Sequence, residues 1–165
     1  MTGYVLGIDP SLAETGIATP EETYTIPTKA GDPHRLDVIF TAVSVAATPR
    51  EPVALAVVED LPTHAHGAGL TGMAQGVVRL ALIRHEVPYV TVPAATLKKF
   101  ATGKGNATKP DMRMELFKRT GLDLRNDNET DAWWLRQIGL HLLGHPDALP
   151  LPKTHTDALT KVRHP

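Results

Sequence analysis

Apolar and polar positions alternate along the chain in patterns that predict both strands and helices. The run "YVLGID" over residues 4–9 is strand-like and ends on a carboxylate, and "TGIAT" and "TYTIPT" predict the next two strands of a meander. The run "PVALAVVED" over residues 52–60 is almost continuously apolar, which is typical of a parallel strand covered on both faces. "PYVTVP" predicts one more short strand.

Helical periods fill the segments between and after these strands. The first predicted helix has Asp32 as its N-cap and Pro33 at its first position. Three further helices are predicted, over residues 71–86, 110–121 and 127–144. Strands followed by helices that alternate with buried strands predict an α/β fold, with a mixed central sheet flanked by helices and right-handed crossovers.

The length of 165 residues and the hydrophobic content of 42% suit one domain with a core of its own. We expect this domain to span residues 1–145. Residues 146–165 are rich in proline and mostly polar, and we expect this C-terminal tail to be extended or poorly ordered.

The absence of cysteine excludes disulfides, thiolate zinc sites and a cysteine nucleophile. The first residues, "MTGYVLGIDP", have neither a basic region nor a cleavage site, and no apolar run approaches the roughly 18 residues that a membrane span needs. We therefore expect a soluble, cytoplasmic protein with no membrane partner.

Charge is unevenly distributed, although the net charge is only −1. Residues 98–125 contain eight basic and three acidic side chains, a local excess of five positive charges. A solvated helical face and a phosphate-binding surface both fit this pattern.

Three carboxylates stand where strands end or where a helix begins. Asp9 ends the first strand, Glu59 ends the most buried one, and Asp131 lies near the start of the last helix. Neighbouring parallel strands share one edge of a sheet, so the three side chains can converge there. Each also has a structural interpretation, because Asp9 suits a turn and acids at a helix start complement the helix dipole.

Converging carboxylates need cations, because burying like charges together costs several kcal/mol. All-oxygen ligation favours Mg²⁺ or Mn²⁺, and two such ions about 4 Å apart are a common device for phosphodiester hydrolysis. Asp127 and Asn128 lie four and three residues before Asp131, so either one shares a helix face with it.

Four motifs together resemble the RuvC-type Holliday-junction resolvases, in family order across residues 4–143: "GIDPSLAETGIA", "VVEDLP", "LKKFATGKGNATK" and "NDNETDAWWL". The resemblance implies a ribonuclease-H-like fold, a homodimer, and hydrolysis of DNA strands at a four-way junction with two Mg²⁺ ions per site, for which Mn²⁺ can substitute. The chain looks like a divergent, phage-like member of this family.

The resemblance also implies roles for individual residues. Asp9, Glu59 and Asp131 fall on the catalytic metal-binding carboxylates, and the fourth ligand position falls on Asn128, with Asp127 as its neighbour and alternative. Lys98 and Lys109 fall on the two important lysines of the family. The DNA-binding residues that we expect are Lys98, Lys99, Lys104, Lys109 and Arg113.

One departure from the family pattern leaves the substrate open. The family carries an aromatic wedge shortly after the second carboxylate, and here that position falls on Pro62, with no aromatic residue between Phe40 and Tyr89. A broader nuclease for forks and flaps therefore stays an alternative to a strict junction resolvase. A non-catalytic junction-binding module is a further alternative, hinted at by Asn128. An actin-like ATPase or sugar kinase fits less well, because the chain is short and lacks a second phosphate-binding repeat.

Three smaller features have two interpretations each. His64 and His66 suit exposed loop residues or a metal-binding pair. Gly72 and Gly76 lie one turn apart on an apolar helix, which suits a dimer interface or burial under a neighbouring helix. The adjacent tryptophans, Trp133 and Trp134, suit core packing better than base stacking.

Overall fold

The structure, a computed structural model, describes residues 3–61 and 68–165. In this part of the chain five strands form one sheet in the order β3-β2-β1-β4-β5. The strands are β1 (Tyr4–Asp9), β2 (Glu14–Ala18), β3 (Thr23–Pro27), β4 (Val53–Glu59) and β5 (Tyr89–Val92). The first three pair antiparallel as a meander, whereas β1, β4 and β5 run parallel. The mixed sheet predicted from the sequence is confirmed.

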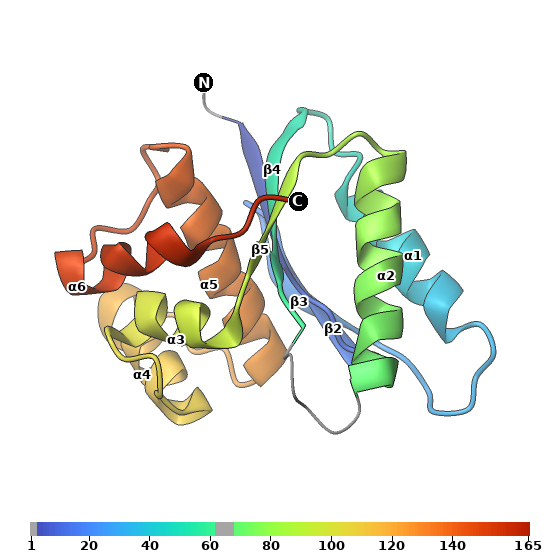
Figure 1. Cartoon of the computed structure of the whole chain (residues 1–165), viewed down its shortest axis with the longest axis horizontal. Coiled ribbons are helices and arrows are strands. Elements are labelled where there is room, and N and C mark those ends of the chain that lie inside the picture. The colour runs from blue at the N-terminus through green and yellow to red at the C-terminus, as the bar shows by residue number, and fades with distance from the viewer. Residues whose placement is uncertain (1–2, 62–67) are drawn as a thin grey trace.

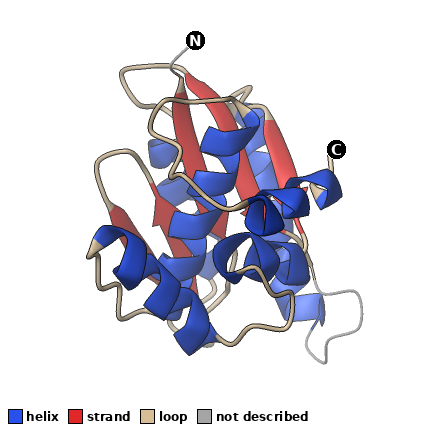
Figure 2. Ribbon diagram, turned by 90° about the vertical axis from the view of Figure 1, so that its left-hand side faces the viewer, coloured by secondary structure: helices blue, strands red, loops and turns tan. Residues whose placement is uncertain are grey.

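Helices cover both faces of the sheet (Figure 1). They are α1 (Arg35–Ala46), α2 (Ala68–Arg84), α3 (Ala94–Thr102), α4 (Lys109–Thr120), α5 (Asp127–Leu142), α6 (Lys153–Thr156) and the 3-10 helix η1 (Asp157–Lys161). α1 and α2 lie on one face, and α5 lies on the other face together with α3, α4 and α6. Figure 2 looks onto the α5 side.

The central strand β4 contributes side chains to a hydrophobic core on each face. Ala56 and Val58 belong to the core under α1 and α2, whereas Leu55 and Val57 belong to the core under α5. Trp134 lies fully buried in the second core, and its Nε1 donates to the carbonyl of Met112 at 3.2 Å. The prediction of core packing for Trp134 is therefore confirmed.

Two glycines let α5 lie directly on the sheet. A Cβ atom at Gly7 of β1 would collide with the backbone of α5 at Ala132, and one at Gly16 of β2 would collide with it at Asn128. Because glycine has no side chain, the helix backbone can approach both strands at these points. This contact places the first turns of α5, including Asp131, above the end of β1.

The helix ends differ in detail from the sequence prediction. α1 begins at Arg35 with His34 as its N-cap, while Asp32 accepts a hydrogen bond from the His34 amide at 2.8 Å just outside the helix. α4 begins at Lys109, where Thr108 forms a capping box with Asp111.

The C-terminal tail is folded, so the expectation of an extended or poorly ordered segment is wrong. α6 and η1 pack against α3, and the buried His155 contacts the Phe100 carbonyl through Nδ1 at 2.9 Å. Arg163 then pairs with Thr91 at the outer edge of β5. The apolar side chains of the tail cover the core under α5, which explains why it folds back. A domain boundary at residue 145 stays a prediction.

The described helices include none with the length and apolarity needed to cross a membrane.

Candidate active site

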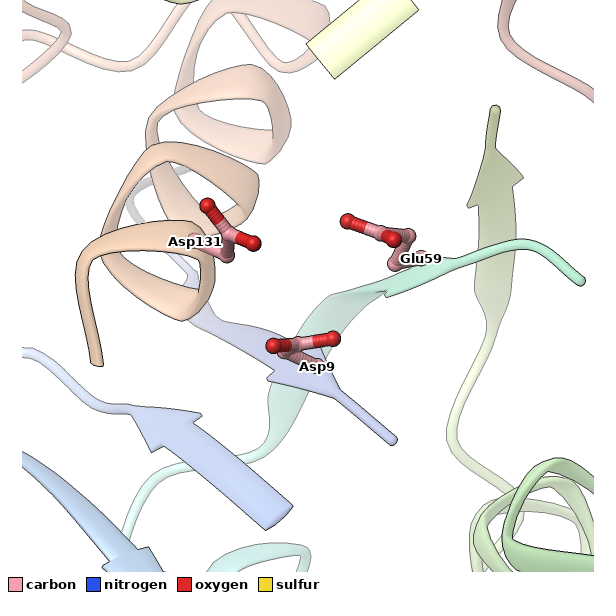
Figure 3. Close-up of side chains that lie close together, drawn as sticks. All are labelled: Asp9, Glu59 and Asp131. Atoms are coloured by element: carbon pink, nitrogen blue, oxygen red, sulfur yellow. The ribbon is translucent and has the colours of Figure 1, made fainter. Parts of the chain in front are cut away.

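Three carboxylates meet at one edge of the sheet (Figure 3). Asp9 is the last residue of β1 and Glu59 is the last residue of β4, and these neighbouring parallel strands end together. Asp131 reaches the same place from the second turn of α5. One oxygen from each side chain lies within 4.8 Å of the others. The predicted convergence of these residues is confirmed.

Burial makes the ionised cluster costly. Asp9 is 8% exposed and Asp131 only 1%. Burial and the charge of Glu59 raise the pKa of Asp9 to about 7, against the opposing charge of Lys109. Burial also raises the pKa of Glu59, while Lys109 and Lys98 act in the opposite direction. These shifts mark a site that favours additional positive charge.

An unpartnered oxygen points to the same conclusion. Oδ2 of Asp131 accepts a hydrogen bond from the Lys109 ammonium group. Oδ1 of Asp131 is buried and has no hydrogen-bond partner among the described residues. An unsatisfied buried carboxylate oxygen costs stability unless a ligand contacts it.

Lys109 and Lys98, two of the expected DNA-binding residues, lie close to the carboxylates. Lys109 is the first residue of α4 and contacts Asp131 directly. Lys98 is half-buried on α3, and its charge acts on Glu59. Lys99 and Lys104 are exposed. Arg113 donates to Asp123 Oδ1 through Nε at 2.8 Å and Nη2 at 2.6 Å, so its charge is already paired.

Asp127 and Asn128 occupy different surroundings from the three carboxylates. Asp127 is exposed at the start of α5 and lines a cavity on α4, and it does not belong to the cluster of Asp9, Glu59 and Asp131. Asn128 is half-buried near Glu14. Hydrogen bonds from Thr25 Oγ1 at 2.7 Å and from Asn126 Nδ2 at 2.9 Å hold the pKa of Glu14 below its usual range. The assignment of Asn128 or Asp127 as the fourth metal ligand stays a prediction. Pro62, His64 and His66 lie outside the described residues.

A supporting network that the sequence did not reveal surrounds Glu59. Gln75 of α2 donates to the Glu59 carbonyl oxygen, and Arg79 donates to Gln75 Oε1 at 3.2 Å. Arg79 also contacts Asp60 at 3.1 Å, and Arg163 of the tail contacts the other oxygen of Asp60 at 2.9 Å. No motif spacing links these residues, because they come from β4, α2 and the C-terminus.

The chain matches no protein-family model. It is 31% identical to the crossover junction endodeoxyribonuclease RuvC of Chlamydia trachomatis serovar L2 over 165 residues, which covers 89% of this chain and 96% of that protein. The chain belongs to the RuvC family. The RuvC of Bordetella petrii is 30% identical over 131 residues, which is 72% of each chain.

Solved RuvC structures have the same fold. The Thermus thermophilus RuvC structure superposes with a TM-score of 0.71 at 22% identity, covering 90% of this chain and 99% of that one. The T. thermophilus RuvC in complex with a Holliday junction substrate gives a TM-score of 0.73 at 20% identity and covers 99% of both chains. The ribonuclease-H-like fold expected from the sequence is confirmed.

Proposed function

We propose that this chain is a divalent-metal-dependent endonuclease that resolves Holliday junctions by paired, symmetric nicks. Its RuvC relatives are named for crossover junction cleavage. The observation that carries the proposal is the convergence of Asp9, Glu59 and Asp131 at one sheet edge. We place the activity in the cytoplasm, the compartment that holds the DNA of the bacterial relatives.

The donor set fits a hard divalent cation. All three residues offer carboxylate oxygens, which Mg²⁺ and Mn²⁺ prefer. The raised pKa of Asp9 and the unpartnered Oδ1 of Asp131 are features that bound positive charge relieves. We assign Asp9, Glu59 and Asp131 as the ligands of two ions, with Asn128 as the fourth ligand. Bound ions of this kind supply an activated water and stabilise the leaving oxygen of a phosphodiester.

The remaining residues of the site orient the DNA strand. Lys109 lies against Asp131 and is only partly exposed, so its ammonium group can move from the carboxylate to an incoming phosphate. Lys98 offers a second cation beside Glu59. The exposed Lys99 and Lys104 extend this positive surface along α3 and the loop after it, where they contact phosphates of the duplex arms. Such contacts make binding depend on salt concentration.

The exposed face of α2 supports a homodimer. Four large apolar side chains on α2 are 47–61% exposed, namely Leu70, Met73, Leu80 and Ile83. A Cβ atom at Gly72 or Gly76 would meet no other atom within 4 Å, so a second helix has room to approach there. Two active sites related by a twofold axis place paired nicks on opposed strands of a symmetric junction.

A panel of synthetic substrates tests the proposal. The purified protein is incubated with end-labelled four-way junction, fork, flap and linear duplex in Mg²⁺, Mn²⁺ or EDTA. We expect symmetric nicks in the junction in either metal and none in EDTA. If forks and flaps are cut as fast as the junction, the protein is a nuclease for branched DNA in general and not a junction-specific resolvase. Junction binding without cutting in either metal would leave only a non-catalytic binding module.

A further inference from the structure

Phe117 on α4 is an aromatic side chain exposed to solvent. The chain has three phenylalanine, three tyrosine and two tryptophan residues, all within the described part. The other seven are buried or half-buried, whereas Phe117 is 51% exposed. Met114, one turn earlier on the same helix, is 53% exposed. The two side chains together form an apolar surface on the outside of α4.

This surface forms one wall of a cavity of about 460 Å³. The volume lies in the range of roughly 300–1,000 Å³ that is usual for small-ligand pockets. The lining residues are Pro110, Arg113, Met114, Phe117, Asp123 and Asp127. The cavity therefore combines a flat aromatic ring with a few polar groups, which is the composition of a site for a planar polar ligand.

The polar groups that line the cavity are better suited to accept hydrogen bonds from a ligand than to donate them. The Arg113 guanidinium is held by Asp123 through two contacts of 2.6 and 2.8 Å, so its charge is already neutralised. Asp127 forms no salt bridge with any described residue and is exposed. A phosphate in this cavity would face two carboxylates and one paired arginine, which is unfavourable. A neutral ring that carries an amino group matches the free carboxylate of Asp127.

The cavity adjoins the candidate active site through both of its helices. Lys109, which contacts Asp131, immediately precedes the cavity residue Pro110 on α4. On α5, Asp127 comes one turn before Asp131, about 6 Å along the helix axis. A DNA strand held at the carboxylates therefore has a neighbouring nucleotide within reach of this cavity.

We propose that the α4 cavity binds one unpaired base of the DNA substrate, stacked on Phe117, with its exocyclic amino group donating to Asp127. This inference rests on the proposed function, because branched DNA supplies the unpaired base. Stacking on an aromatic side chain accepts any base, whereas a carboxylate acceptor favours bases with an amino group. Adenine, cytosine and guanine carry such a group and thymine does not. The cavity therefore has a built-in preference against thymine.

Binding in EDTA tests this proposal without cleavage. The affinity of the full chain is measured for junctions with one unpaired adenine or one unpaired thymine at the crossover, and for linear duplex. We expect Phe117→Ala to weaken binding of the adenine junction by about tenfold and to leave duplex binding unchanged. Phe117→Tyr keeps a stacking ring and restores the affinity. Asp127→Ala removes the acceptor for the amino group and abolishes the preference for adenine over thymine.

Leu143→Ala is the matched control, since Leu143 is 41% exposed and follows the C-terminal end of α5. An unchanged affinity of Phe117→Ala for the adenine junction would overturn the proposal while leaving the nuclease function intact, because wild-type cleavage is scored separately. An equal loss on junction and duplex would also overturn it. So would a change of oligomeric state in Phe117→Ala, which would make this surface a protein interface. A wild-type protein that neither binds nor cuts branched DNA would instead overturn the proposed function itself.

Discussion

Asp60 and Arg163 lie 103 residues apart in the sequence and form an ion pair of 2.9 Å. Asp60 directly follows Glu59, and its amide donates to the Val92 carbonyl at 2.8 Å. Arg79 holds the other oxygen of Asp60 from α2. The C-terminal tail therefore fixes the point at which the chain leaves β4, and with it the backbone of a candidate metal ligand.

Arg163→Ala removes this ion pair and should lower the cleavage rate of a four-way junction by about tenfold. Loss of a group that orients a metal ligand typically costs about 10- to 100-fold in activity, and we expect the lower end of that range. The free energy of unfolding should change by less than about 1 kcal/mol, because the pair is partly exposed and Arg79 remains. The apparent Mg²⁺ affinity, measured from the rate at several metal concentrations, should fall with the rate. Lys161→Ala, an exposed cation in the same tail, serves as the control. Equal rates for both variants would show that the tail has no part in positioning Glu59.

Gly16→Ala should displace α5 from the sheet. The added Cβ collides with the backbone of α5 at Asn128, and overpacking of this kind costs about 1–3 kcal/mol. Cleavage should fall as well, because Asp131 lies on the displaced helix. Gly69→Ala on α2 meets no atom within 4 Å and should be neutral or slightly stabilising. Chemical denaturation of both variants checks the stability, and an unperturbed Gly16→Ala protein would contradict the close approach of α5.

The sequence predicted Asp9, Glu59 and Asp131 together because strand periodicity fixes where a strand ends, and parallel strands end at a shared edge. The close packing of α5 on Gly7 and Gly16 was not predictable. A glycine within a strand pattern can indicate that another part of the backbone lies close, but the sequence does not show which part. Arg163 was missed for a similar reason. Its partner Asp60 is remote in the sequence, and the tail looked polar because its few apolar side chains are widely spaced.

The metal-free protein should become less stable as the pH rises from about 4 to about 7. Asp9 has an ordinary pKa of 3.8, which the fold raises to about 7 through burial and the charge of Glu59. The folded state therefore holds this proton more tightly than the unfolded state, so its stabilising effect is complete below pH 4 and is lost as the pH passes 7.

Asp9→Asn should remove the Asp9 part of this pH dependence, because asparagine stays neutral, and leave only the part that comes from the raised pKa of Glu59. In EDTA at pH 8 the variant should unfold at a higher temperature than the wild type, whereas adding Mg²⁺ should stabilise the wild type and leave the variant almost unchanged. Thermal unfolding scans across this pH range provide the measurement. A variant less stable than the wild type in EDTA at pH 8 would show that the ionised cluster is not a source of instability.

Leu80→Lys on α2 should convert a dimer into a monomer. The side chain is 47% exposed on the proposed interface, so a charge there opposes association without disturbing the core. Light scattering measures the mass, and the two nicks in one junction should become uncoupled in the variant. Leu143→Lys places the same charge beyond the far end of α5 and should leave the mass unchanged. A wild-type protein that is monomeric both alone and on the junction would contradict the dimer.

Whether Asp9 and Asp131 hold the catalytic ions is decided by the rate of junction nicking in Mg²⁺, compared between the wild type, Asp9→Asn, Asp131→Asn and the control Asp37→Asn. Asp37 is an exposed carboxylate on α1, which lies on the face of the sheet opposite to α5. If Asp9 and Asp131 hold the catalytic ions, both variants should still bind the junction, but their nicking rates should fall by more than about 100-fold. A loss of up to about 100-fold is typical of a residue that only orients a metal ligand. Asp37→Asn should cut at the wild-type rate. Wild-type nicking by either Asp9→Asn or Asp131→Asn would show that these carboxylates are not the metal site of the nuclease.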